Sequence, residues 1–239
     1  MINFKIITIF PEAFSSYFNI SIIKRALSKK LIKIQIFNLR KWTNDRHQTV
    51  DDRPYGGGAG MVFMIEPIFK ALKALTKNKN KKRRIILFSV SGKKFTQQDA
   101  ERLKKYEEII FICPHYEGVD ARVKKLIDEE ISIGDYILTG GELPAMVVID
   151  AITRLIPGVI NEDSLKEESF YLHPDAKDNK KKISQGVLYY EYPQYTRPEV
   201  FYPEPKNKKM AWRVPKVLLS GDHKKIQEWR EKHLIRRKQ

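Results

Sequence analysis

Short apolar segments alternate with helix-like segments over residues 1–156, and this alternation limits the possible folds more than any other feature. Strand-like segments occupy residues 4–10, 31–37, 84–90 and 108–113, and a shorter one lies near 131–138. Apolar residues at helical spacing lie at about 11–27, 67–75, 96–106, 120–128 and 143–156. Nearly continuous apolar strands joined by helices form parallel sheets that are covered on both faces. The sequence therefore predicts an α/β fold of this kind.

The character of the sequence changes after Pro157-Gly158. Residues 161–185 are polar and contain the run KDNKKK, as is typical of a flexible linker. Beyond them lie aromatic and proline-rich turns, and then a predicted helix after Ser220-Gly221. We expect a main domain at 1–160, a linker at 161–185 and a small C-terminal domain at 186–239.

Positive charge is the strongest global feature, with a formal net charge of +16. The stretch Lys70–Arg84 carries eight cations and no acid. Clustered Lys and Arg favour a polyanionic partner such as nucleic acid, although a chain rich in lysine throughout would show a similar total. No apolar run reaches the roughly 20 residues of a membrane span, and the N-terminus lacks the features of a signal peptide. A single cysteine, Cys113, excludes an intramolecular disulfide. We expect a cytoplasmic protein without a membrane partner.

The segment VDDRPYGGGAGM, Val50–Met61, is the first of four glycine loops. It lacks the Gly-Lys-Ser/Thr of a P-loop, and the first predicted strand-to-helix turn, TIFPEAF, has no glycine for a dinucleotide fingerprint. Three further loops follow predicted strands, at residues 88–94, 113–120 and 132–146. Because the carboxyl ends of parallel strands meet at one edge of a sheet, these three loops predict one nucleotide-like pocket.

Other candidate sites are weaker. Cys113 fits a buried strand residue better than a nucleophile, since the sequence positions no base beside it. His47 with Asp45, Asp51 and Asp52 lacks the fixed spacing of a metal site. The aromatic residues Tyr189, Tyr190, Tyr192 and Tyr195 either stack on bases or pack the core of a small domain.

Six segments resemble the bacterial tRNA (guanine-N1)-methyltransferases of the TrmD type and follow the order of that family. They are VDDRPYGGGAGM, YEGVDARV, IDEEISIGDYILTGGELPAM, RLIPGV, YTRPEV and VPKVLLSG. The resemblance implies methylation of N1 of the guanine at tRNA position 37, with S-adenosyl-L-methionine as methyl donor. It implies a SPOUT-type parallel sheet with a trefoil knot, followed by a small, mainly helical domain that binds tRNA. It also implies an obligate homodimer with shared active sites, and adds Mg²⁺ as a second candidate cofactor.

The resemblance assigns roles to individual residues. The implied catalytic residues are Arg154, near the guanine O6, and Glu168, as the general base that removes the N1 proton. The implied substrate-binding residues are Asp51, Asp52, Arg53, Tyr55, Gly58 and Ser169. The implied cofactor-binding residues are Ser89, Val90, Gly92, Pro114, Tyr116, Glu117, Gly118, Ile133, Gly134, Asp135, Tyr136, Ile137, Leu138, Gly140, Gly141 and Pro144.

The chain departs from the family pattern in several places. Glu168, with Glu167 beside it, stands where the family has an aspartate, and Asp163 is the alternative base. Pro114-His115 stands where Gly-Arg is common, so the backbone N–H of Pro114 is absent. Val90 replaces a usual proline, the linker is longer, and the C-terminal domain is shorter. Two alternative functions stay open at this stage: a knotted RNA methyltransferase with another target base, and a tRNA-binding relative without catalysis.

Overall fold

The computed structural model describes residues 1–78, 81–161, 164, 187–190, 192–204, 210–233 and 235–238. The chain forms two compact units, Met1–Asn161 and Glu162–Gln239, and each is described by itself. Residues 165–185 of the predicted linker lie outside the described residues, so the expectation of a flexible linker stays a prediction.

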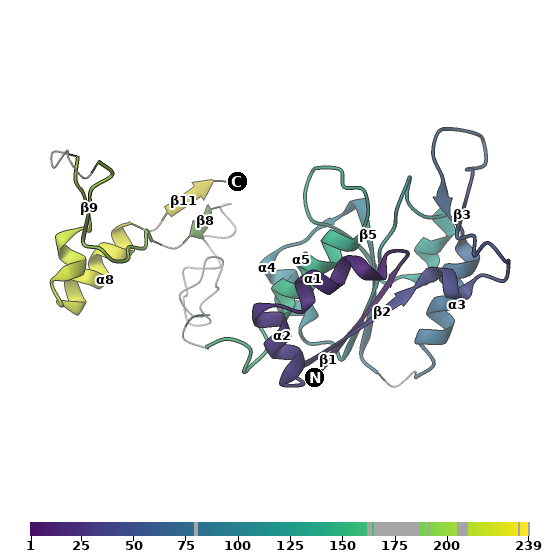
Figure 1. The fold of residues 1–239 in the computed structure, drawn as a ribbon, viewed down its shortest axis with the longest axis horizontal. Helices are drawn as coiled ribbons and strands as arrows, with labels where there is room; N and C mark the ends of the chain where they lie inside the picture. The colour runs from purple at the N-terminus through teal and green to yellow at the C-terminus, as the bar shows by residue number, and fades with distance from the viewer. Residues whose placement is uncertain are drawn as a thin grey trace. The chain divides into compact units, whose positions relative to one another are not determined.

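A parallel sheet of five strands forms the centre of the first unit, in the order β2-β1-β6-β5-β7 (Figure 1). These strands are β1 (Ile2–Thr8), β2 (Ile32–Asn38), β5 (Arg83–Lys94), β6 (Glu108–Ile112) and β7 (Glu129–Ser132). Every pairing between them is parallel, which confirms the predicted sheet type. A separate hairpin pairs β3 (Asp51–Asp52) with β4 (Val62–Phe63).

Helices cover both faces of this sheet, as the strand order requires. Figure 1 shows α1, α2, α4 and α5 on one side and α3 on the other. Right-handed crossovers explain this division, because β1 to β2 and β5 to β6 step in one direction along the sheet, while β2 to β5 and β6 to β7 step in the opposite direction. The first layer consists of η1 (Pro11–Phe14), α1 (Ser15–Phe18), α2 (Ser21–Ser28), α4 (Gln97–Leu103) and α5 (Glu142–Thr153). The second consists of η2 (Leu39–Trp42), α3 (Ile65–Leu75) and η3 (Ala121–Leu126), the η elements being 3₁₀ helices.

Apolar strand residues and helix stripes form the core. All five residues of β6 are buried, as a central strand covered on both faces must be. On the α3 side, Ile68 and Leu72 pack with strand residues and with Val50 and Phe63 from the two ends of the first glycine loop. That loop is therefore fixed at both ends by buried apolar side chains.

The pairing of β5 with β7 contains the main irregularity of the sheet. Phe88 pairs with Ile131, and Lys93 pairs with the same Ile131, so Ser89–Gly92 leave the ladder and return to it. A Cβ on Gly92 would lie 2.7 Å from the backbone N and C of Ile131. Glycine is required there because a side chain would separate the two strands.

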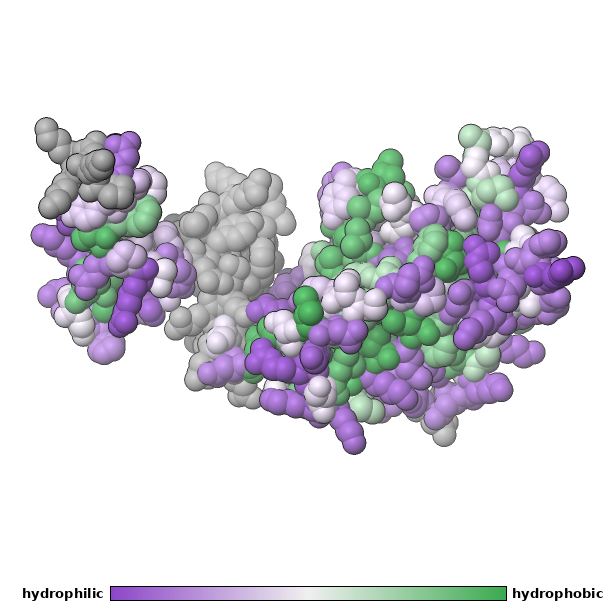
Figure 2. Space-filling view, in the orientation of Figure 1, coloured by the Kyte–Doolittle hydropathy of each residue, from purple (hydrophilic) through white to green (hydrophobic). Residues whose placement is uncertain are grey.

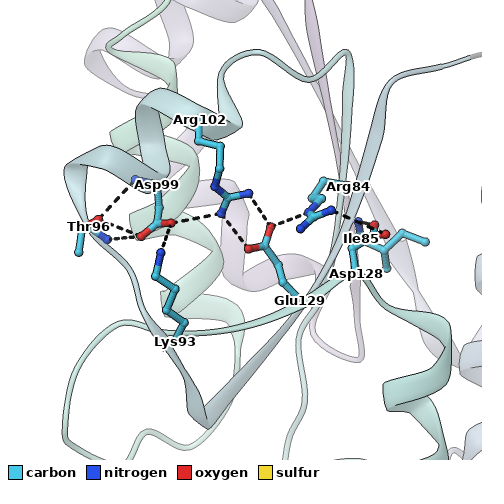
Figure 3. Close-up of polar contacts among 8 residues, drawn as sticks. All are labelled: Arg84, Ile85, Lys93, Thr96, Asp99, Arg102, Asp128 and Glu129. Atoms are coloured by element: carbon cyan, nitrogen blue, oxygen red, sulfur yellow. Dashed lines mark hydrogen bonds and ion pairs between the residues drawn. The ribbon is translucent and has the colours of Figure 1, made fainter.

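A polar network joins β5, β7 and α4 beside this irregularity in the pairing (Figure 3). Glu129 of β7 accepts hydrogen bonds from Arg84 at 2.9 Å and from Arg102 at 2.8 Å. Asp99 accepts from Lys93 at 2.8 Å and from Arg102 at 3.2 Å, and forms the capping box of α4 with Thr96. The cap confirms the predicted start of this helix at Thr96. Burial opposes ionisation of Glu129 and of Asp99, but the hydrogen bonds to their cationic neighbours outweigh burial and lower the pKa of both carboxyls.

Several predicted elements differ from the structure. The predicted helix at 120–128 is the short 3₁₀ helix η3, in which the Asp120 side chain accepts from the backbone N of Arg122. The predicted helix at 11–27 is interrupted, since Ser21 has a φ of 48° at the start of α2. The predicted strand at 131–138 was wrong beyond Ser132, because the chain turns at Gly134, with a φ of 156°.

The second unit combines short strands with helices. Its described elements are β8 (Val187–Tyr190), β9 (Val200–Phe201), β10 (Trp212–Arg213), η4 (Lys216–Leu219), α8 (His223–Lys232) and β11 (Ile235–Lys238). Strands β9 and β10 pair antiparallel, as do β8 and β11. The sequence analysis predicted neither of these strand pairs. Whether the whole unit is mainly helical stays a prediction, because part of it lies outside the described residues.

The unit has a small aromatic cluster. Trp229 of α8 stacks on His233 at 4.2 Å between ring centroids and meets the Tyr195 ring edge-on, while Arg230 lies over Tyr192. Tyr192 and Tyr195 therefore contribute to packing within the unit. The side chains of Tyr189 and Tyr190 are outside the described part of the structure.

Within the described ranges, no helix is both long enough and apolar enough to cross a membrane.

We predict that the network around Glu129 makes the first unit sensitive to acid. Carboxyls whose pKa is lowered by folding stabilise the native state above their unfolded pKa and lose that contribution as the pH falls through the folded value. Thermal denaturation should show a constant Tm above about pH 5 and a falling Tm below it. Replacing Glu129→Gln should lower the free energy of unfolding at pH 7 by about 2 kcal/mol.

Glu66→Gln is the matched control, since Glu66 forms an exposed pair with Lys70 that is worth only about 0.5 kcal/mol. Equal losses for the two variants would contradict the role given to the network.

Candidate functional site

A cavity of about 410 Å³ opens at the carboxyl edge of the sheet. Its walls come from three segments: residues 89–91 within β5, where that strand leaves its ladder, 114–119 after β6, and 132–141 after β7. The volume lies in the usual range of small-molecule sites, roughly 300–1,000 Å³. The three later glycine loops thus meet at one place, as predicted, although residues 89–92 lie within β5 and not after its end.

Most of the residues expected to bind the cofactor line this cavity. They are Ser89, Val90, Pro114, Tyr116, Glu117, Gly118, Ile133, Gly134, Tyr136, Ile137, Leu138, Gly140, Gly141 and Pro144. Gly92 and Asp135 are not among the lining residues. Gly92 lies instead against the backbone of Ile131 where the β5–β7 pairing is interrupted, and the exposed carboxylate of Asp135 pairs with Lys94.

The structure also adds Lys124 and Glu130, which the sequence reasoning missed, to the lining residues. Lys124 lies beside the cavity and forms an ion pair with Glu130 of β7 at 2.9 Å, and Ser91 approaches the other oxygen of Glu130 at 3.4 Å. These polar side chains carry no motif. Ser91 and Glu130 come together only because both lie where the β5–β7 pairing is interrupted, which the sequence does not show.

Close backbone contacts fix two of the walls. The backbone N of Gly141 donates to the carbonyl O of Pro114 at 2.8 Å. A Cβ on Gly141 would lie 2.6 Å from the Cα of Cys113. The loop before α5 can therefore approach the end of β6 only because residue 141 is a glycine.

A buried carboxylate also packs against the loop before α5. Glu142, in the first turn of α5, is only 8% exposed, and its Oε1 accepts a hydrogen bond from Thr8 Oγ1 at 2.6 Å. A helix N-terminus is a favourable place for a negative charge. A Cβ on Gly140 would lie 2.4 Å from Glu142 Oε2 and 2.7 Å from His115 Nδ1, so this position also requires glycine.

Cys113 has no role as a nucleophile in this arrangement. The thiol is buried at the end of β6, and burial, reinforced by the charge of Glu142, raises its pKa well above the ordinary value. A thiol held in its protonated form is a poor nucleophile.

The first glycine loop lies beside the cavity without lining it. The β3–β4 hairpin holds its ends, and the backbone N of Glu117 donates to the carbonyl O of Met61 at 3.1 Å. A Cβ on Gly60 would lie 2.5 Å from the Glu117 side chain. Residues 50–61 are thus attached to a wall of the cavity through Glu117.

The residues expected to bind substrate or to catalyse the reaction are placed differently. Asp52, Arg53, Tyr55 and Gly58 are exposed along the hairpin, Asp51 is half-buried, and Arg154 is half-buried at the C-cap of α5. None of these six residues lines the cavity of this single chain. Glu168, Glu167, Ser169 and Asp163 lie outside the described residues, so their positions stay predictions.

No group of three or more His, Cys, Asp and Glu side chains within the described residues is arranged to hold a metal ion. The carboxylate of Asp45 instead accepts hydrogen bonds from the backbone N and the hydroxyl of Thr49, and the hydroxyl bond in particular lowers its pKa. Asp52 accepts from the backbone N of Arg53. These acids shape the loop that carries them.

Comparison with known proteins gives a consistent result. Residues 2–239 match the model of the family described as "tRNA (Guanine-1)-methyltransferase TrmD". A protein of Dictyoglomus turgidum is 49% identical over 238 residues, which are 99% of this chain and 86% of that protein. One from Carboxydothermus hydrogenoformans is 51% identical over 232 residues, 96% of this chain and 81% of its own length. One from Bacillus cereus is 45% identical over 234 residues, which are 97% of this chain and 86% of that protein. All three are called tRNA (guanine-N(1)-)-methyltransferase.

We predict that Gly141→Ala destabilises the first unit. The added methyl group meets backbone atoms of Cys113 that cannot rotate away, and overpacking of this kind costs about 1–3 kcal/mol. Chemical denaturation followed by circular dichroism would measure the loss. Thr139→Ala, at an exposed position in the same loop, should change stability by less than about 0.5 kcal/mol. A stable Gly141→Ala variant would show that the two walls can separate without cost.

Proposed function

The chain belongs to the tRNA (guanine-1)-methyltransferase family TrmD, and from this premise we propose that it methylates N1 of the guanine at tRNA position 37 with S-adenosyl-L-methionine as methyl donor. The observation that carries the proposal beyond the family name is the cavity at the carboxyl edge of the sheet. It is the place where the three glycine loops meet.

The residues of this cavity fit a flat, nucleoside-containing ligand. Gly140 and Gly141 bring bare backbone to the cavity wall, and nearby apolar side chains such as Ile133 and Leu138 suit the faces of an adenine ring. The exposed backbone groups of these loops suit its polar edge. S-adenosylmethionine supplies an electrophilic methyl group when bound.

The chain must remove a proton for the transfer to occur. The guanine N1 carries a weakly acidic proton, so a positioned base is required. We assign that role to Glu168, and we assign to Arg154 the stabilisation of the negative charge that moves to O6 as the proton leaves.

Two chains are needed for this active site in our proposal. Arg154 and the hairpin residues do not line the cavity within one chain, which is expected if each site is built from both subunits. An apolar surface is available for dimerisation: α5 exposes Leu143 (56%) and Val147 (47%) one turn apart, although its opposite face is buried in the core. Figure 2 shows hydrophobic residues exposed among hydrophilic ones on the visible face of this unit. Exposed apolar residues on a helix whose other face is packed in the core mark a surface for contact with another chain.

The remaining expectations from the family complete the proposal. We place the enzyme in the cytoplasm, with tRNA bound in part by the second unit and with Mg²⁺ as a further cofactor to which no residue is assigned. We propose a SPOUT fold with a trefoil knot at the cofactor loops. What supports the knot is membership of the family.

A transfer assay tests the function directly. The protein is incubated with S-adenosylmethionine carrying a labelled methyl group and with tRNA transcripts that have G or A at position 37. Label in the G37 transcript alone supports the proposal. Label in both transcripts indicates another target base, and tRNA binding without label indicates a non-catalytic relative.

We predict that Glu168→Gln abolishes transfer but leaves binding of S-adenosylmethionine unchanged. An amide cannot accept the N1 proton, and the loss of a general base costs about 10²–10⁴ in rate. Single-turnover kinetics measure the rate, and calorimetry measures binding of the cofactor. Glu167→Gln is the matched control and should keep most of the activity. If Glu167→Gln and not Glu168→Gln abolishes transfer, the base is the neighbouring residue.

We predict that Val147→Asp separates the dimer. A charge at the centre of the exposed face of α5 would be buried without a partner, which strongly disfavours association. Light scattering after size-exclusion chromatography should give the mass of one chain, and transfer should fall by at least about tenfold because each site would lose the residues of its partner. Phe69→Asp, on an exposed position of α3 in the other layer, should stay dimeric. A dimeric Val147→Asp variant would exclude this surface.

A further inference from the structure

Two aromatic rings lie exposed side by side on the β9–β10 hairpin. Phe201 of β9 and Trp212 of β10 are directly paired in the antiparallel register. Their ring centroids are 5.8 Å apart with the planes tilted by 43°. Phe201 is 50% exposed and Trp212 is 64% exposed. Large apolar surface in contact with water is unfavourable, so a pair of rings held in this way indicates a contact with another molecule.

The hairpin rings differ from the other aromatic residues of the unit. Trp229 is half-buried and is held between His233 and Tyr195, and Tyr192 lies under the guanidinium of Arg230. Those rings build the small core. Phe201 and Trp212 meet each other and leave the rest of their faces exposed.

The charge around the rings limits the kind of partner. Arg213 follows Trp212 on the strand and is exposed, and the connection between the two strands contains Lys206, Lys208 and Lys209 in the sequence. Residues 187–239 contain thirteen Lys and Arg against six Asp and Glu. A second copy of the same hairpin would bring like charges together. A polyanion would bring opposite charges to the hairpin and is therefore the better partner.

We propose that the rings of Phe201 and Trp212 stack on an unpaired base of the RNA substrate, while Arg213 contacts its phosphates. Aromatic side chains bind single-stranded RNA by stacking on splayed bases, whereas the bases of an RNA duplex are closed to them. The inference rests on the proposed function for the identity of the RNA. It adds a contact outside the guanine that is methylated.

Binding of tRNA by Trp212 variants tests the inference. Trp212→Ala should weaken binding of an unmodified tRNA transcript by about tenfold, and Trp212→Phe should keep most of the affinity because it retains a ring. Leu219→Ala, an exposed apolar position on η4 of the same unit, is the control and should bind as the wild type does. Circular dichroism verifies that each variant is folded.

Tryptophan fluorescence shows whether stacking is the cause. A single-stranded oligoribonucleotide should quench the wild type more than Trp212→Phe, and a duplex of equal length should quench both weakly. Equal tRNA affinity for wild type and Trp212→Ala, or equal quenching by duplex and single strand, would overturn the inference.

The transfer assay keeps the two hypotheses apart. A wild type that methylates G37 while Trp212→Ala binds tRNA normally refutes only the hairpin contact. A wild type that transfers no methyl group refutes the proposed function, and the fluorescence result still decides the stacking.

Discussion

The backbone contact between Gly92 and Ile131 is the constraint on which the candidate site depends. Parallel strands β5 and β7 would normally form one uninterrupted ladder. Here β5 releases Ser89–Gly92 and then resumes pairing at the same residue of β7, so a loop arises in the middle of a strand. That loop forms one wall of the cavity, and the segment after β7 forms the opposite one. The ion-paired side chains of Glu129, Arg102 and Asp99 hold β7 and α4 together beside the interrupted pairing.

Much of this fold could be predicted from the sequence, and the missing part has a physical cause. Continuous apolar runs such as Ile109–Ile112 identify central strands because burial on both faces leaves no room for alternation. Thr96 identifies a helix start because its hydroxyl can accept a backbone N–H. Local patterns cannot report contacts between distant segments. The break in pairing at Ser89–Gly92 depends on Ile131, and the packing at Gly140 depends on Glu142, which is held by Thr8. No rule of residue spacing relates Ile131 to Ser89–Gly92 or Thr8 to Gly140.

Backbone contacts hold two walls of the candidate cavity together, and the departures from the family pattern at Pro114 and Val90 do not remove them. Gly141 is held by the carbonyl of Pro114, which a proline retains although it lacks the N–H. Val90 lines the cavity while its side chain is 72% exposed, so replacement of a usual proline changes little in the framework. The positions that cannot accept a side chain are Gly92 and Gly141, where a Cβ would lie within 3 Å of backbone atoms.

The first glycine loop follows a different rule from the others. A Cβ on Gly56 or Gly57 would meet no atom within 4 Å, yet these residues have φ values of 85° and 80°. Conformation and not space therefore requires glycine there. Val50 and Phe63 are fully buried at the ends of the loop, and Gly60 packs on Glu117 in the cavity wall. The tip is bare backbone exposed to solvent, with polar groups available to another molecule. A loop that is rigid at its base, attached to the candidate cofactor cavity and open at its tip is suited to connect that cavity with a bound substrate.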